Sequence, residues 1–247
     1  MNGRQASMVA LRRAREVVNP ALRGTLGRVP RRQWPGVVMN YLGSGASIMV
    51  GKGETAMLCG IFQESTVRDF ATAVGPQGRI IVVEANPANT RRLQTALASS
   101  GNVEIVNAAV WHTDTPLEFE FADQAEAQHY NRVRDSTLQS FPTHMVAAPE
   151  VVNVDGERLT TTMDRFGIDV VDHLNLTING AEEAAFRGAQ GEAAAERVRR
   201  IYAHTELPDP GVAFENRLLE LGFRTRKSGR LNSRNPAIDL RRLYAWR

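Results

Sequence analysis

Residues 54–110 alternate between short apolar runs and stretches with helical spacing, and this alternation restricts the fold more than any other feature. The runs ETAMLCGIF, RIIVVE and NVEIVNAAV have the composition of buried strands. Between the first two runs, apolar residues recur at Val67, Phe70, Ala71 and Val74, the spacing of one helix face. Strand, helix, strand, helix, strand within so short a stretch indicates parallel βαβ units.

Strand and helix signals continue to the end of the chain, where DLRRLYAW reads as a final strand. Residues 37–247 are therefore predicted to form a single doubly wound α/β domain. Residues 1–36 are Arg-rich, contain three prolines and read as an N-terminal appendage. Residues 122–149 are polar and irregular, which predicts a long loop or lid.

A single carboxylate, Glu84, follows the apolar run IIVV directly, and a helix signal begins just beyond it at Pro87. In open α/β sheets, ligands bind outside the carboxyl ends of the strands. Gly60 and Glu84 both follow predicted strands at such ends. A carboxylate there accepts hydrogen bonds from the two hydroxyls of a ribose, and a glycine lets a ligand approach the backbone. The alternative is that Glu84 caps the following helix, whose N-terminus favours an anion.

Four segments carry a resemblance to a known family: RIIVVEANPANTRRL, NVEIVNAAVWHTDTPLEFEF, LTTTMDRF and LNLTINGAEEAAFRGA. In order and spacing, over about residues 54–206, the chain resembles the FkbM-type methyltransferases, a branch of the S-adenosylmethionine-dependent class I fold. The resemblance implies a Rossmann-like sheet, mostly parallel with an antiparallel last strand. It also implies transfer of a methyl group from S-adenosyl-L-methionine to a hydroxyl of a small or glycosylated acceptor.

The resemblance further implies which residues hold the methyl donor. Glu84 would bind the ribose, Gly60 would pass the methionine part, and Ala108 and Ala109 would lie beside the adenine. With their neighbours and the end of a later strand, the candidate cofactor-binding residues are Cys59, Gly60, Glu84, Asn86, Ala108, Ala109, Thr177 and Asn179.

The chain also departs from the family pattern. Asn175, Thr177 and Asn179 stand where the family has lysine, aspartate and glutamate, while Leu58 and Glu64 replace an aspartate and a glycine of the first turn. A divalent-metal site needs hard oxygen ligands, so the loss of two carboxylates predicts no metal. These changes keep a second hypothesis open, a non-catalytic binding or scaffold protein with the same fold.

Methylation of a hydroxyl is helped by a general base as the proton leaves. His204 and Glu206 lie two residues apart in RIYAHTEL, a spacing that places both side chains on one face of a strand. We predict them as a catalytic base and its orienting group, with a surface pair or a core histidine as the alternative. His112, with Trp111 stacking beside it, is another candidate near the adenine end.

The single cysteine, Cys59, excludes a disulfide framework and a cysteine metal site. The sequence has neither an apolar run long enough to span a membrane nor a secretory h-region, so a soluble, cytoplasmic protein is expected.

Charge is distributed unevenly around the net value of +3. Residues 1–34 hold eight arginines against one acidic residue, and residues 217–247 hold nine basic against two acidic residues. Basic ends predict weak contact with an anionic surface, lipid or nucleic acid, and the alternative is a solvated Arg-rich tail. Aromatic residues accompany these arginines only at Trp34, Tyr244 and Trp246, which argues against a single-strand stacking platform and predicts no specific nucleic-acid partner.

Overall fold

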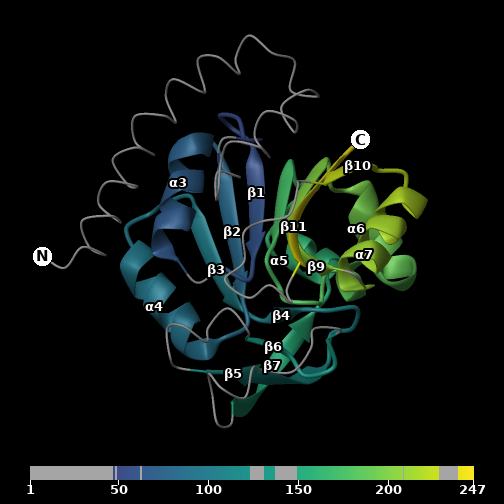
Figure 1. The fold of residues 1–247 in the computed structure, drawn as a ribbon. Helices are drawn as coiled ribbons and strands as arrows, with labels where there is room; N and C mark the ends of the chain where they lie inside the picture. Colours follow the sequence, from purple (N-terminus) through teal and green to yellow (C-terminus); the bar gives the residue numbers. More distant parts are fainter. Residues whose placement is uncertain are drawn as a thin grey trace, which may run out of the picture.

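The computed structural model describes residues 47, 49–61, 63–122, 131–136, 149–207, 209–227 and 239–247. Its main feature is a seven-stranded sheet with helices on both faces (Figure 1). In spatial order, the strands are β10 (Arg224–Lys227), β11 (Asp239–Trp246), β9 (Arg200–Leu207), β8 (His173–Leu176), β1 (Thr55–Cys59), β2 (Arg79–Glu84) and β3 (Val103–Asn107).

Five of these strands run parallel. β1 pairs with β2 on one side and with β8 on the other, β2 pairs with β3, and β8 pairs with β9. The last strand, β11, is antiparallel to both of its neighbours, β9 and β10. The predicted doubly wound sheet, mostly parallel with an antiparallel last strand, is therefore confirmed.

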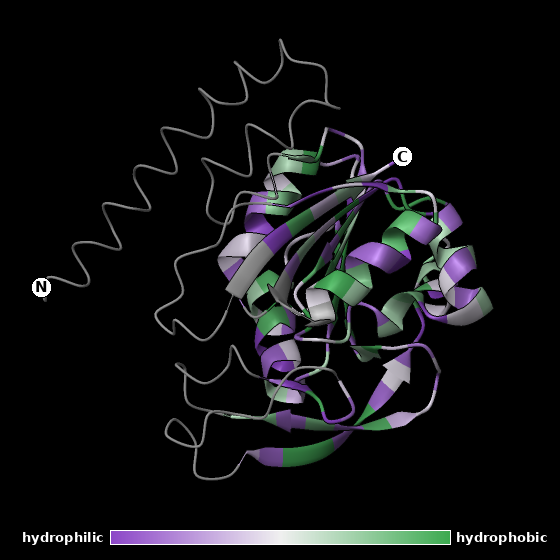
Figure 2. Ribbon diagram, turned by 45° about the vertical axis from the view of Figure 1, so that its right-hand side comes forward, coloured by the Kyte–Doolittle hydropathy of each residue, from purple (hydrophilic) through white to green (hydrophobic). Residues whose placement is uncertain are grey.

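The helices divide into two layers because each has one apolar face to bury. Helices α3 (Glu64–Val74) and α4 (Pro87–Leu97) cover one face of the sheet. The other face is covered by α5 (Leu159–Arg165), α6 (Gly188–Glu196) and α7 (Asp209–Glu220) (Figure 1). In Figure 2 the helices alternate hydrophobic and hydrophilic residues, as this layering requires.

A second, four-stranded sheet lies beside the carboxyl ends of the main sheet (Figure 1). Its strands, in spatial order, are β4 (Ala109–Val110), β7 (Glu150–Glu157), β5 (Pro116–Phe121) and β6 (Arg132–Val133). The chain passes from β3 into this sheet at Ala108. The prediction of one long loop over residues 122–149 is wrong at β6, which pairs antiparallel with β5. Residues 123–130 and 137–148 lie outside the described residues.

The second sheet packs through its own apolar cluster. Phe119, Phe121 and Val154 contact Ala181 and Ala184, which follow β8 and lead into the short 3-10 helix η4 (Ala184–Phe186). This packing holds the second sheet over the turn after β8. No helix in the described part of the chain is long and apolar enough to cross a membrane.

The predicted domain limits stay a prediction, since the proposed appendage, residues 1–36, lies outside the described residues.

Candidate functional site

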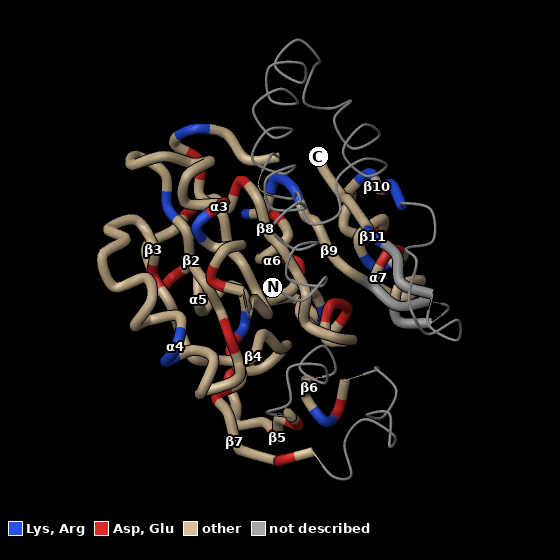
Figure 3. The backbone as a smooth tube through the Cα atoms, turned by 60° about the vertical axis from the view of Figure 1, so that its left-hand side comes forward, with Lys and Arg blue, Asp and Glu red and all other residues tan. Residues whose placement is uncertain are grey.

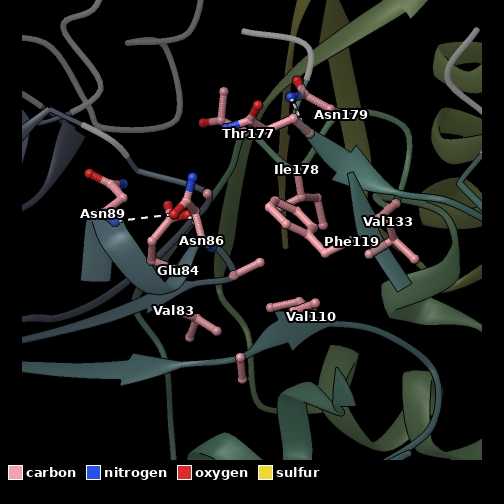
Figure 4. Close-up of a pocket in the computed structure, with 16 residues that line it drawn as sticks. Val83, Glu84, Asn86, Asn89, Val110, Phe119, Val133, Thr177, Ile178 and Asn179 are labelled. Carbon is pink, nitrogen blue, oxygen red and sulfur yellow. Dashed lines mark hydrogen bonds between the residues drawn. The ribbon is translucent and has the colours of Figure 1, made fainter. Parts of the chain in front are cut away.

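A cavity opens where the carboxyl ends of β1, β2 and β8 meet the second sheet, and it holds about 760 Å³ of empty space, part of it open to solvent (Figure 4). Its walls come from both sheets. The lining residues are Gly60, Val83, Glu84, Ala85, Asn86, Asn89, Ala108, Ala109, Val110, Phe119, Asn131, Val133, Thr177, Ile178, Asn179 and Ala181.

Glu84 is the ionisable residue of this wall, at the last position of β2 and only 6% exposed. Its Oε1 accepts a hydrogen bond of 2.8 Å from the backbone N–H of Asn86. Burial raises the pKa of Glu84 from 4.5 to about 7, although the hydrogen bonds from Asn86 and Asn89 and the charge of Arg92 pull it down. None of the described residues forms an ion pair with it, so its charge above pH 7 is uncompensated by direct contact.

Asn86, and not Glu84, caps helix α4. The Asn86 side-chain oxygen accepts from the backbone N–H groups of Ala88 and Asn89, at 2.9 and 3.2 Å, and Pro87 occupies the first turn. The alternative role of Glu84 as the helix cap is therefore wrong. Its carboxylate keeps acceptor capacity toward the cavity.

Gly60 ends the turn after β1 with φ +75°, in the left-handed region that favours glycine. A Cβ atom here would lie 2.2 Å from the carbonyl oxygen of Thr177, so the glycine lets the β1 and β8 ends approach each other. Cys59 precedes it but does not line the cavity. Its fully buried thiol packs in the core between the sheet and α5–α7, and burial raises its pKa.

The β8 end supplies polar groups without charge. Asn175 donates from Nδ2 to the Thr177 hydroxyl at 3.2 Å, and Asn179 donates to the carbonyl of Asn131 at 2.6 Å, which ties this turn to the second sheet. Asn179 has φ +50°, the left-handed conformation that asparagine tolerates. Glu182 accepts from the N–H groups of Ile178 and Gly180 and so fixes the turn.

Ala108 and Ala109 line the cavity where the chain crosses between the sheets. The second sheet adds Phe119 and Val133 to the wall (Figure 4), and Asn131, just before β6, adds a third residue; sequence reasoning missed all three. The run LEFEF alternates apolar and acidic residues, as a strand with one exposed face does, but nothing local indicates that this strand faces β8.

His204 does not line the cavity. Its ring lies on the sheet face that carries Tyr202, with Nε2 3.1 Å from the Tyr202 hydroxyl. Burial first, and the charge of Arg242 second, lower the pKa of His204 to about 4, so it is neutral at pH 7. The predicted base is therefore partly buried beside Tyr202 and is not among the residues that line the cavity. The side chain of Glu206 lies outside the described residues.

Trp111 and His112 also lie apart from the cavity lining. Trp111 is buried in the apolar cluster of the second sheet, and its ring centroid is 5.1 Å from that of His112. In the described residues, no group of three or more His, Cys, Asp or Glu side chains is placed to hold a metal ion.

The sequence matches no protein-family model and no curated protein. The family suggested by the sequence segments is thus not confirmed. Among solved structures, the chain is similar to fibrillarin from Aeropyrum pernix in complex with bound S-adenosyl-L-methionine, with 14% identity over 79% of this chain and 67% of that one, at a TM-score of 0.45.

Two further solved structures have comparable scores. Precorrin-6y C5,15-methyltransferase from Geobacter metallireducens is 14% identical over 83% of this chain and 85% of its own, with a TM-score of 0.41. A SAM-dependent methyltransferase from Aquifex aeolicus is 11% identical over 85% and 88%, with a TM-score of 0.42. At these scores the similarity does not indicate which ligand this chain binds or which reaction it catalyses. The residues of the cavity are the basis for both.

Proposed function

We propose that this chain is an S-adenosylmethionine-dependent O-methyltransferase, of FkbM type, that methylates a hydroxyl of a small or glycosylated acceptor. The observation that carries the proposal is Glu84. It is a buried carboxylate at the carboxyl end of β2, it lines a cavity, and none of the described residues forms an ion pair with it. Such a carboxylate gains most from two hydroxyl donors held side by side, as on a ribose.

The rest of the wall fits the same donor. Val83, Ala108 and Val110 are apolar and flank Glu84, as an adenine ring requires, and Thr177 and Asn179 offer neutral hydrogen-bonding groups on the opposite side. The donor, when bound, supplies an electrophilic methyl group. The chain binds the nucleoside and orients an acceptor hydroxyl that enters beside Phe119 and Ile178.

Acceleration by this site comes mainly from positioning. Among the described lining residues, Glu84 is the only ionisable one, so the wall offers no separate general base. Holding the acceptor oxygen in line with the methyl group lowers the barrier by removing the entropy cost of the encounter. The proton of the hydroxyl then leaves to water.

A second candidate function is a donor-independent binding or scaffold protein. The β8 end favours this candidate. There the side chains of Asn175 and Asn179 already donate hydrogen bonds to the Thr177 hydroxyl and to the Asn131 carbonyl. Polar groups already bonded within the protein bind a ligand only after those bonds break.

Calorimetric titration with S-adenosylmethionine and with its demethylated product separates the two candidates. We expect binding that strengthens as pH rises from 6 to 8, because Glu84 becomes charged through a pKa of about 7. Glu84→Ala should weaken it by about 1–3 kcal/mol, since charged hydrogen bonds are lost. Glu150→Ala is the matched control, because Glu150 is an exposed carboxylate on β7.

Two outcomes would contradict the proposal. No binding by the folded protein would leave the scaffold candidate in the lead. Equal binding by wild type and Glu84→Ala would remove Glu84 from the donor site. If donor binding is found, a panel of sugar and small alcohols with isotope-labelled methyl donor tests the acceptor class.

A further inference from the structure

The outer edge of the main sheet, far from the cavity, carries a concentration of basic residues. Strand β10 is an edge strand with the sequence RTRK, and Figure 3 shows its Lys and Arg positions beside the C-terminal end of the described chain. Within the sheet, Arg224 pairs with Trp246 and Arg226 pairs with Tyr244. Trp246 in turn pairs with Arg200, the first residue of β9, so this corner is at the amino end of the parallel strands. The cavity is at their carboxyl ends.

Register places the arginines and the aromatic residues on one face. Residues directly opposite each other in an antiparallel pair point to the same side of the sheet, so Arg224 and Arg226 share a face with Trp246 and Tyr244. The two aromatic rings stack, with centroids 5.4 Å apart and planes inclined by 26°. Lys227 points to the other face, where it pairs with Glu215 of α7.

A hollow opens at this corner, and its wall combines an indole with two guanidinium groups. The lining residues are Leu221, Gly222, Arg224, Trp246 and Arg247. Arg247 is held in place by a 2.6 Å hydrogen bond to the Leu221 carbonyl and by its position 4.3 Å from the centre of the Phe223 ring. Neither contact neutralises its charge.

The arginines here differ from most others in the described chain. Arg68, Arg79, Arg158, Arg187 and Arg197 each pair with a carboxylate. Arg224 and Arg226 are exposed and have no side-chain partner among the described residues, and Arg247 has no carboxylate partner there. Within the described part of the chain, no carboxylate neutralises these three charges, and this favours an anionic ligand.

We propose that this corner, the Trp246 hollow with Arg224, Arg226 and Arg247, binds single-stranded nucleic acid without sequence preference. A base stacks on the indole, and the phosphates on either side contact the guanidinium groups. A bilayer is a poorer fit, because Trp246 is partly buried, stacks on Tyr244 and lines a hollow. The site is separate from the cavity, so it does not rest on the proposed methyl transfer.

The test is fluorescence anisotropy of the full chain with a labelled polyuridylate of about ten nucleotides, a typical footprint for such sites. Affinity is measured over a range of salt concentrations. Arg224→Ala and Arg247→Ala should each weaken binding severalfold and reduce the slope of log K against log salt by about 0.7, the value for one phosphate contact on a single strand. Arg91→Ala is the matched control, an exposed arginine of α4 with no side-chain partner among the described residues.

Trp246→Ala should weaken binding by about fivefold or more, and Trp246→Phe should retain most of it, because a phenyl ring still stacks. If Trp246→Ala does not fold, the phenylalanine variant and the two surface arginine variants decide the question. Equal binding by all variants would overturn the proposal and assign affinity to another basic segment, such as residues 1–34. No oligonucleotide binding would also overturn it. Binding of phosphatidylglycerol vesicles instead, lost in Arg224→Ala, would identify a lipid surface.

Discussion

The two ends of the parallel sheet place a carboxylate in opposite electrostatic surroundings, with an ion pair at one end and without one at the other. At the amino ends of β1 and β9, Glu54 accepts hydrogen bonds from the Gly51 N–H and from Arg200, both at 2.6 Å. The side chains of Glu54 and Arg200 are only 16% and 13% exposed. At the carboxyl end of β2, Glu84 is more deeply buried, at 6% exposed, and faces a cavity, with hydrogen bonds and no ion pair from the described residues.

The difference shows what each end is built for. A carboxylate with a cation and a backbone donor has its desolvation cost offset within the protein, so the amino end adds to stability. A buried carboxylate without a cation beside it lowers the stability of the folded state, and the raised pKa of Glu84 reflects this cost. That cost is tolerable where the same oxygens serve a ligand.

The largest predicted effect is a difference of sign between two isosteric substitutions. At pH 8, Glu54→Gln should destabilise the protein by about 3 kcal/mol, because it leaves Arg200, whose side chain is only 13% exposed, without its counter-charge. Glu84→Gln should stabilise it by about 1 kcal/mol, because it removes an unpaired buried charge at the price of weaker hydrogen bonds. Urea unfolding at equilibrium measures both.

The pH dependence of Glu84→Gln checks the cause. A group whose pKa is raised on folding binds protons more tightly in the folded state, so its unfavourable contribution grows as pH rises from 4.5 to about 7. The advantage of the glutamine variant should be full above pH 7 and vanish near pH 4.5. An advantage that is constant with pH would mean that shape, and not charge, is responsible.

A smaller effect is expected from two glycines with nearly equal, positive φ angles. Gly53, before β1, and Gly60, after it, have φ of +77° and +75°. A Cβ atom at Gly53 meets nothing within 4 Å, whereas at Gly60 it would lie 2.2 Å from the Thr177 carbonyl oxygen. Gly53→Ala should therefore cost only the left-handed strain, about 1–2 kcal/mol.

Gly60→Ala should cost about 1–3 kcal/mol more than Gly53→Ala, because the β1 and β8 ends must separate. Donor binding should weaken as well, since both ends line the cavity. Thermal unfolding of the two variants side by side gives the difference. Equal losses of stability in the two variants would show that the β8 end moves away from β1 at little cost. Gly60 would then not be required for the close approach of the two strand ends.

The sequence predicted the main sheet because its signals are local. Apolar runs with intervening helical spacing define β1 to β3 and helices α3 and α4, and seven of the eight predicted cofactor residues do line one cavity. Most of them lie at or just beyond the carboxyl ends of strands, which meet at one edge of a parallel sheet. Cys59, the last residue of β1, is the exception, because its side chain points into the core.

The second sheet and its share of the cavity could not be predicted in this way. The parallel pairing of Ala109 with Gly156 joins segments far apart in sequence, and no residue in either segment specifies the other. Phe119 and Val133 were missed for that reason. The roles of His204 and Glu206 stay a prediction, because His204 is not among the residues that line the cavity and the Glu206 side chain lies outside the described residues.

The smallest effect concerns a buried base at the amino end, His173, the first residue of β8. It is fully buried beside Phe70, with ring centroids 5.6 Å apart, and neither ring nitrogen has a hydrogen-bond partner among the described residues. Burial first, and the charge of Arg200 second, lower the pKa of His173 from 6.5 to about 3. Unlike Glu84, this group is not among the residues that line the cavity at the carboxyl ends, and it packs against Phe70.

The sign of its pH effect follows from linkage. Between pH 6.5 and about 3 the unfolded chain binds the proton and the folded chain does not, so stability is full above pH 6.5 and falls below it. At pH 5.5 the loss from His173 is about 1.4 kcal/mol, one pH unit below the unfolded pKa. In His173→Leu this loss should disappear, so the free energy of unfolding should decrease less steeply as the pH falls below 6.5. The contribution of His204, whose pKa is about 4, should remain. If the stability of the variant falls at acid pH as steeply as that of the wild type, His173 takes up its proton in the folded protein as readily as in the unfolded chain. In that case a buried ionisable group at the amino end can titrate in the folded state, as Glu84 does at the carboxyl end.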